Sequence, residues 1–67
     1  STEFHKQLGY TFTEYLTMAR IQRASELLSH SSLHVYEVAQ AVGYENTTYF
    51  STIFKRRYGV SPKQYRG

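Results

Sequence analysis

Apolar residues recur in steps of three and four along residues 13 to 30, as they do on the buried face of a helix. They are Leu16, Ile21, Ala24, Leu27 and Leu28. Thr13 and Glu14 suit the first turn of such a helix. The Ser- and His-rich stretch 29 to 32 then interrupts the pattern, as a loop does. The sequence therefore predicts one long helix over residues 13 to 30.

A second, shorter apolar pattern follows, again in steps of three and four. It consists of Val35, Val38, Ala39 and Val42. This spacing predicts a short helix. Gly43 is placed to end it, because glycine adopts the left-handed backbone conformation at little cost. The small side chain of Ala39 would let a following helix cross closely.

Residues 46 to 58 form the third predicted helix, with Asn46 as a good N-cap and Gly59 closing it. Ser61 and Pro62 then start one more turn, with serine as the cap and proline at the first helical position. No stretch alternates apolar and polar residues for long, so we expect an all-α fold. A short helix, a glycine turn and a second helix form the helix-turn-helix pattern, which many helical hairpins share.

The third helix has two unlike faces. At about 100° per residue, one arc is apolar and should face the core. It holds Phe50, Ile53, Phe54 and Tyr58, and the opposite arc carries Thr48, Ser51, Thr52, Lys55 and Arg56. The second arc places short hydroxyls toward the N-terminus and cations toward the C-terminus. Such hydroxyls can approach base edges and the thymine methyl, whereas cations reach phosphates.

Charge is unevenly distributed along the 67 residues, which make one small domain at most. From Ser51 onward there are five basic residues and no acidic one, whereas residues 1 to 50 hold three basic and five acidic residues. A basic C-terminal part suits an anionic partner such as nucleic acid. The alternative is a merely solvated face. Because a solvated helix more often mixes glutamate with lysine, the absence of acids between Asn46 and Gly67 favours nucleic acid.

Other functional classes have little support in the composition. The chain has no cysteine, so it can form neither disulfides nor a thiolate metal site. His5, His30 and His34 lack metal-ligand spacing with acidic partners, and we expect no cofactor. With no aspartate, no cysteine and no nucleophile–base constellation, we predict that the protein is not an enzyme. No long apolar run and no signal peptide are present, so we expect a soluble, cytoplasmic protein.

The first fifteen residues resemble residues 51 to 65 without a gap. Identical pairs are Ser1 and Ser51, Thr2 and Thr52, Phe4 and Phe54, Gly9 and Gly59, and Tyr15 and Tyr65. Internal repeats indicate a duplicated structural unit, of which about 35 residues would lie upstream of this chain. On this interpretation the chain starts near the end of one unit and contains the next unit whole.

Several side chains allow more than one interpretation. The aromatic residues could be stacking platforms for single strands, but their helical spacing favours a place in the core. They are Tyr44, Tyr49, Phe50, Phe54, Tyr58 and Tyr65. Arg20 and Arg23 could touch phosphate. For Arg20, which lies near the apolar face of its helix, we favour an internal ion pair with Glu37 or Glu45.

Residues 13 to 66 resemble the DNA-binding region of the arabinose-regulator (AraC/XylS) family of bacterial transcription factors. The matching stretches are YLTMARIQRASELL at 15 to 28, VYEVAQAVGYENTTYFSTIFKRRYG at 35 to 59 and SPKQYR at 61 to 66. The resemblance implies an all-α, homeodomain-like helix-turn-helix fold with a long N-terminal linker helix. Residues 1–9 would be the remnant of a first recognition helix, residues 10–31 the linker helix, and residues 32–67 the second helix-turn-helix unit.

The resemblance also implies sequence-specific binding to promoter DNA, with activation or repression of transcription. Base-reading positions carry over to Thr47, Thr48, Ser51 and Thr52, with Asn46 and Lys55 near the backbone. From the face of the helix, Arg56 joins Lys55 as a phosphate contact. The chain departs from the family pattern at Thr47, where proline is frequent, and at His34, where a small capping residue is usual. It also has Thr52 in place of a frequent arginine, a strong guanine reader.

Two classes of function therefore remain. The favoured one is a DNA-binding module whose partner is double-stranded promoter DNA, with RNA polymerase as a further possible partner. The other is a small helical interaction domain whose basic face meets an acidic protein or RNA polymerase. We also expect Phe4 and Leu8 either to pack on the long helix or to pair with a second copy of the chain.

Overall fold

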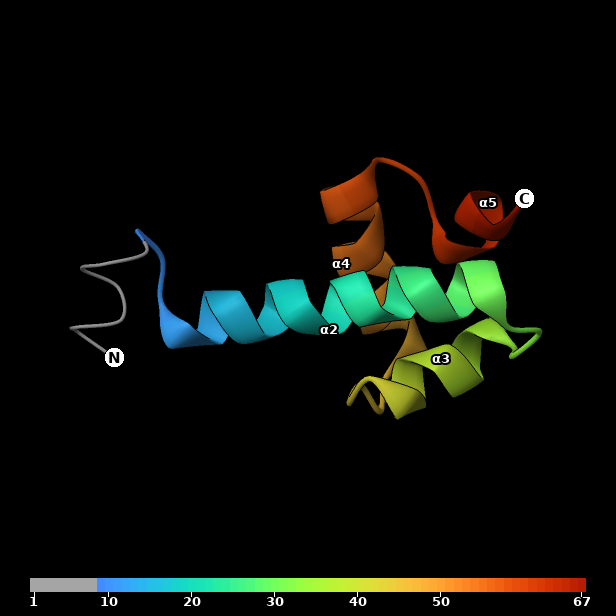
Figure 1. The fold of residues 1–67 in the computed structure, drawn as a ribbon, viewed down its shortest axis with the longest axis horizontal. Helices are drawn as coiled ribbons and strands as arrows, with labels where there is room; N and C mark the ends of the chain where they lie inside the picture. The colour runs from blue at the N-terminus through green and yellow to red at the C-terminus, as the bar shows by residue number, and fades with distance from the viewer. Residues whose placement is uncertain (1–8) are drawn as a thin grey trace.

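The computed structural model describes residues 9–67, and these fold as helices joined by short turns. The elements are α2 (Phe12–His30), α3 (Val35–Ala41), α4 (Thr47–Tyr58) and α5 (Pro62–Arg66). Helix α2 forms the long axis, and the other three helices gather around its C-terminal half (Figure 1). Within residues 9–67 there is no strand, and the all-α prediction is confirmed. None of the described helices is long and apolar enough to cross a bilayer.

The end of a first recognition helix, predicted for residues 1–9, falls almost wholly outside the described residues, as do Phe4 and Leu8. The long helix begins at Phe12, one residue before the predicted start. Its first turn is closed by a capping box. The Thr11 hydroxyl accepts the backbone N–H of Glu14 at 3.0 Å, and the Glu14 carboxylate accepts the backbone N–H of Thr11 at 2.8 Å.

The predicted ends of α4 and α5 are confirmed. The side-chain oxygen of Asn46 accepts the backbone N–H of Tyr49 at 2.9 Å, which caps α4. Gly59 ends the helix with a φ of 81°, in the left-handed region. Ser61 caps α5, and Pro62 is its first residue.

The internal repeat is visible in the backbone as well as in the sequence. Gly9 and Gly59 have φ angles of 79° and 81°. Two residues after each glycine a capping box opens a helix, at Thr11 for α2 and at Ser61 for α5. Helix α5 therefore corresponds to the first turn of α2, which supports a duplicated unit.

The turn between α3 and α4 is set by its glycine. Gly43 has a φ of 106°, a backbone conformation that residues with a Cβ rarely adopt. The next residue, Tyr44, donates its backbone N–H to the carbonyl of Ala39 at 2.8 Å, which closes the C-terminus of α3. His34 occupies the N-cap position of α3, and its backbone N–H donates to the Glu37 carboxylate at 2.8 Å.

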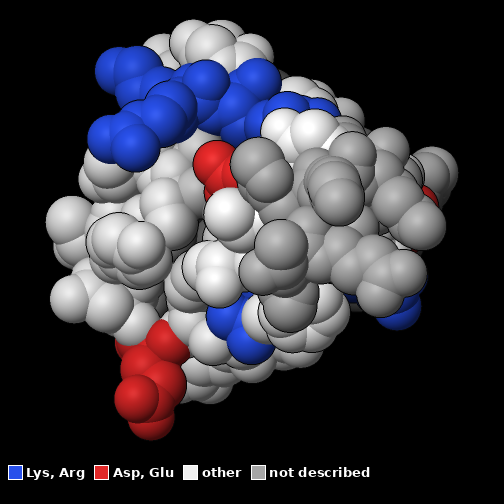
Figure 2. Space-filling model, turned by 90° about the vertical axis from the view of Figure 1, so that its left-hand side faces the viewer, with Lys and Arg blue, Asp and Glu red and all other residues white. Residues whose placement is uncertain are grey.

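Figure 2 shows the charged side chains on the surface that faces the viewer when α2 is seen from its N-terminal end. Lysine and arginine gather at the top of Figure 2, the height at which α4 ends in Figure 1. An acidic side chain lies directly beneath them, other acidic side chains lie at the bottom left, and further basic side chains lie lower in the same view. Most of the basic surface in this view therefore lies at the height of the C-terminal end of α4.

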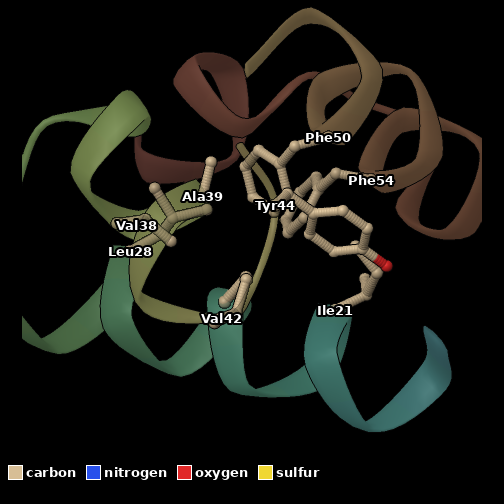
Figure 3. Packing of buried hydrophobic residues seen from close by; sticks show 9 residues of the cluster. Ile21, Leu28, Val38, Ala39, Val42, Tyr44, Phe50 and Phe54 are labelled. Carbon is tan, nitrogen blue, oxygen red and sulfur yellow. The ribbon is translucent and has the colours of Figure 1, made fainter. Parts of the chain in front are cut away.

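The core lies where α3 and α4 pack on the C-terminal half of α2. Its apolar members are Ile21, Ala24, Leu28, Val38, Ala39, Val42, Tyr44, Phe50 and Phe54 (Figure 3). Phe50 and Phe54 of α4 are fully buried. Ala24 and Ala39 are also fully buried, and their small side chains leave room for the helices to approach closely. This packing fixes which face of α4 points outward.

Candidate nucleic-acid interface

The outer face of α4 is free of the protein's own interior. Thr48, Thr52 and Lys55 are all exposed, while Phe50 and Phe54 anchor the opposite face in the core. Of the other predicted contact residues, Asn46 and Arg56 are exposed, and Thr47 and Ser51 are half-buried. The structure thus brings all seven predicted residues together on one helix and its cap.

Three of these residues form a stripe along the helix. Thr48, Thr52 and Lys55 are spaced by four and then three residues, so their side chains lie above one another. The Thr52 hydroxyl donates to the carbonyl of Thr48 at 3.0 Å. Its proton is therefore used within the helix, and its oxygen lone pairs and methyl group remain available for other contacts.

The N-terminus of α4 offers hydrogen-bond donors. The Asn46 side-chain oxygen accepts the Tyr49 N–H, and the amide NH₂ of the same side chain makes no hydrogen bond within residues 9–67. The first N–H groups of a helix likewise lack intrahelical acceptors. Donors at the positive end of a helix dipole suit an anionic group such as a phosphate.

The last turn of α4 carries Lys55, Arg56 and Arg57, and all three are exposed. Within residues 9–67 the recorded ion pair joins Arg23 and Glu26 at 3.2 Å, so these three cations have no carboxylate partner there. Their charge is therefore available to an external anion.

A groove of about 600 Å³ runs between the N-terminal half of α2 and α4. From α2 and the residues before it, the groove is lined by Tyr10, Thr13, Glu14, Thr17, Met18 and Ile21; from α4, by Tyr49, Thr52, Ile53, Arg56 and Arg57. Thr52 and Arg56 thus border this groove, whereas Thr48 and Lys55 do not. The predicted contact surface therefore has two flanks, which meet at Thr52.

The prediction of an ion pair for Arg20 is wrong. Its guanidinium carbon lies 5.5 Å from the ring centroid of Tyr44, and its side chain lies against Gly43. No ion pair links it to Glu37 or Glu45. Arg20 instead makes a cation–π contact that ties α2 to the turn before α4.

The prediction that the aromatic residues are core holds only in part. Tyr44, Phe50 and Phe54 are buried, but Tyr58 and Tyr65 are 36% and 37% exposed, although their rings pack on Phe54. Tyr49 is 58% exposed, so its assignment to the core is wrong. The helical angle could have revealed this, because Tyr49 falls about 140° from Phe54 at 100° per residue.

Comparison with known proteins identifies the family to which this arrangement belongs. The family model described as a helix-turn-helix domain matches residues 1–67. The chain belongs to the AraC-type helix-turn-helix family. It is accordingly a DNA-binding module of the kind found in transcription regulators.

The chain is 44% identical over 63 residues to the HTH-type transcriptional activator RhaR of Cronobacter sakazakii, covering 94% of this chain and 22% of that protein. It therefore spans about a fifth of the length of this relative. Among solved structures, the C-terminal domain of the response regulator yesN from Fusobacterium nucleatum matches with a TM-score of 0.95 and 43% identity, over 100% of this chain and 65% of that one. The C-terminal domain of AraT, a response regulator from Geobacillus stearothermophilus, matches with a TM-score of 0.89 and 47% identity, over 92% of this chain and 51% of that one.

Proposed function

We propose that this module binds duplex DNA by inserting the helix of residues 46 to 58 into the major groove. Base contacts come from Thr47, Thr48, Ser51 and Thr52, and phosphate contacts from Asn46, Lys55 and Arg56. One observation carries the proposal: the exposed face of α4 has short hydroxyls at its start, and at its end it has cations that form no ion pair with any of residues 9–67. Short groups can enter a groove of the width of an α-helix, and cations at one end reach its phosphate wall.

The boundaries that we propose for the units rest on the internal repeat and on the family resemblance. Residues 32–67 form the reading unit and residues 10–31 act as a linker helix, whereas the assignment of residues 1–9 to the end of a first recognition helix falls almost wholly outside the described residues. The repeated glycine and capping-box geometry of Gly9–Glu14 and Gly59–Gln64 supports this division.

Regulation of transcription in the bacterial cytoplasm is the role we infer for the parent protein. RhaR is named a transcriptional activator, which supports activation as the outcome. Contact with RNA polymerase and self-association through residues 1–9 are further proposals. Light scattering that found only monomer at high concentration would contradict self-association.

The salt dependence of duplex binding tests the DNA-binding mode. Three to five phosphate contacts predict a slope of roughly −3 to −4.5 for log affinity against log salt. Because the chain carries one complete reading unit, its dissociation constant should be modest, about 10⁻⁴–10⁻⁶ M. Fluorescence anisotropy with a labelled duplex measures both quantities. Binding to polyglutamate with no binding to duplex would instead support an interaction domain that meets acidic proteins.

A further inference from the structure

Tyr49 is an exposed aromatic side chain in the first turn of α4. It is 58% exposed, whereas the other aromatic residues of this helix are either buried or packed on Phe54. Tyr49, Thr52 and Arg56 are spaced by three and then four residues, so they form a stripe along the helix. All three border the groove between α2 and α4. Tyr49 thus begins the second flank of the predicted DNA-contacting surface.

The ring of Tyr49 is held in place from behind. It meets the ring of Tyr44 edge to face, with centroids 6.0 Å apart and planes at 61°. Tyr44 is itself buried and lies under the Arg20 guanidinium. The backbone of Tyr49 is fixed as well, because its N–H donates to the Asn46 cap. A ring supported in this way loses little conformational freedom when it meets a ligand.

The reach of Tyr49 differs from that of its neighbours on α4. Its phenol ring is longer than the side chains of Thr48 and Thr52, and it stands at the edge of the outer face rather than at its centre. A long group at the edge of an inserted helix meets the sugar-phosphate wall of the groove before it meets the base edges. Tyrosine hydroxyls are among the groups that donate to phosphate oxygens.

The acidic side chain in the groove does not compete for the Tyr49 hydroxyl. Glu14 is the acidic residue that lines the groove, and its carboxylate already accepts the backbone N–H of Thr11 at 2.8 Å in the capping box of α2. The cations that share the groove, Arg56 and Arg57, favour the approach of a phosphate.

We infer that the hydroxyl of Tyr49 donates a hydrogen bond to a DNA phosphate and thereby sets the depth and register of α4 in the major groove. This inference rests on the proposed DNA-binding function and adds a contact that is uncharged and independent of base sequence. Tyr49→Phe removes only the hydroxyl and keeps the ring against Tyr44, so it is the variant that isolates the contact.

The experiment measures affinity of the 67-residue chain for two labelled duplexes, one selected by the chain from a random pool and one with the same bases shuffled. Tyr49→Phe should weaken binding to both about tenfold, as for a hydrogen bond to a charged acceptor. The salt slope should stay unchanged, because an uncharged donor displaces no counterion. Tyr65→Phe, which removes a hydroxyl from α5, is the matched control and should bind like the wild type.

Other outcomes separate the possible failures. Unchanged affinity in Tyr49→Phe, with Lys55→Ala weakened as expected, would overturn the hydroxyl contact of Tyr49 and leave DNA binding intact. A loss confined to the selected duplex would indicate base reading and overturn the phosphate contact. A loss in Tyr49→Ala but not in Tyr49→Phe would assign the contact to the ring. A wild-type chain that binds no duplex would refute the proposed function itself.

Discussion

The guanidinium of Arg66, in the last turn of α5, donates from Nε to the carbonyl oxygen of Leu28 at 3.1 Å. A second nitrogen of the same group donates to the carbonyl of Ser31 at 3.3 Å. Leu28 lies in the last turn of α2, where carbonyls lack intrahelical donors and the helix dipole is negative. Arg66 thus caps α2 from a residue far away in the sequence and fastens α5 to the long helix.

Arg66→Ala should therefore lower the free energy of unfolding by about 1–2 kcal/mol, since it removes charged donors from carbonyls at a helix end. Arg66→Lys should lose roughly half as much, because an ammonium group does not reproduce the planar fork that spans two acceptors. Urea denaturation followed by circular dichroism measures both. Lys63→Ala on the same helix is the control and should stay within about 0.5 kcal/mol of the wild type. An unchanged midpoint in Arg66→Ala would show that solvent satisfies these carbonyls equally well.

Gly43 and Arg20 are coupled through the turn that precedes α4. A Cβ at Gly43 would lie 3.3 Å from both Cζ and Nε of Arg20, and the φ of 106° is unfavourable for alanine. Gly43→Ala should cost about 1–2 kcal/mol from the backbone alone. The steric part is smaller, because the end of the arginine side chain can move aside.

A double-mutant cycle separates these two costs. If the backbone dominates, Gly43→Ala should be almost as destabilising in an Arg20→Ala background as in the wild type. Full rescue by Arg20→Ala would instead locate the cost in the clash with the guanidinium.

The ends of the helices could be predicted from sequence because each is set by a few neighbouring residues. Asn46 and Ser61 cap helices as expected, and Gly59 adopts the left-handed conformation. The predicted start of α2 missed by one residue, since Thr11 completes a capping box with Glu14. The internal repeat could have predicted this cap, because Thr11 corresponds to Ser61, which was expected to cap the last helix.

The partners of long side chains could not be predicted in the same way. Arg66 meets Leu28 across 38 positions of sequence, and only the packing of α5 on α2 brings them together. The sequence offered Glu37 and Glu45 as ion-pair partners for Arg20, but the fold places its guanidinium over the ring of Tyr44. For Tyr58, the helical angle predicted a place on the core face, and its ring does pack on Phe54. The ring lies at the end of α4, however, where it stays partly exposed.

Lys55 tests the electrostatic part of the interface. It is exposed and has no carboxylate partner among the described residues, so truncating it should leave stability unchanged. Lys55→Ala should weaken binding to all duplexes alike and reduce the magnitude of the salt slope by about one. The measurement is affinity over a series of salt concentrations, with Lys63→Ala on α5 as a comparison. An unaltered slope would mean that Lys55 does not meet phosphate.

Thr48 and Thr52 test whether the hydroxyl stripe reads bases. Thr52→Val keeps the shape and a methyl group but removes the hydroxyl that donates to the Thr48 carbonyl. If the methyl group contacts a thymine methyl, this variant should retain the preferred sequence, whereas Thr52→Ser, which lacks the methyl, should change it. If instead the Thr52 oxygen accepts from a base amino group, the effects of the two variants should be reversed.

The Thr48 hydroxyl donates no hydrogen bond within residues 9–67, so Thr48→Ala should alter the sequence preference through loss of either the hydroxyl or the methyl group. Selection from random duplexes with each variant gives the preferred sequences, and titrations on the selected and shuffled duplexes give the affinities. Loss of a base-reading residue should change the difference in binding free energy between the two duplexes by about 1–3 kcal/mol. Equal losses of affinity for both duplexes would show that the two threonines contact the DNA backbone and do not read bases.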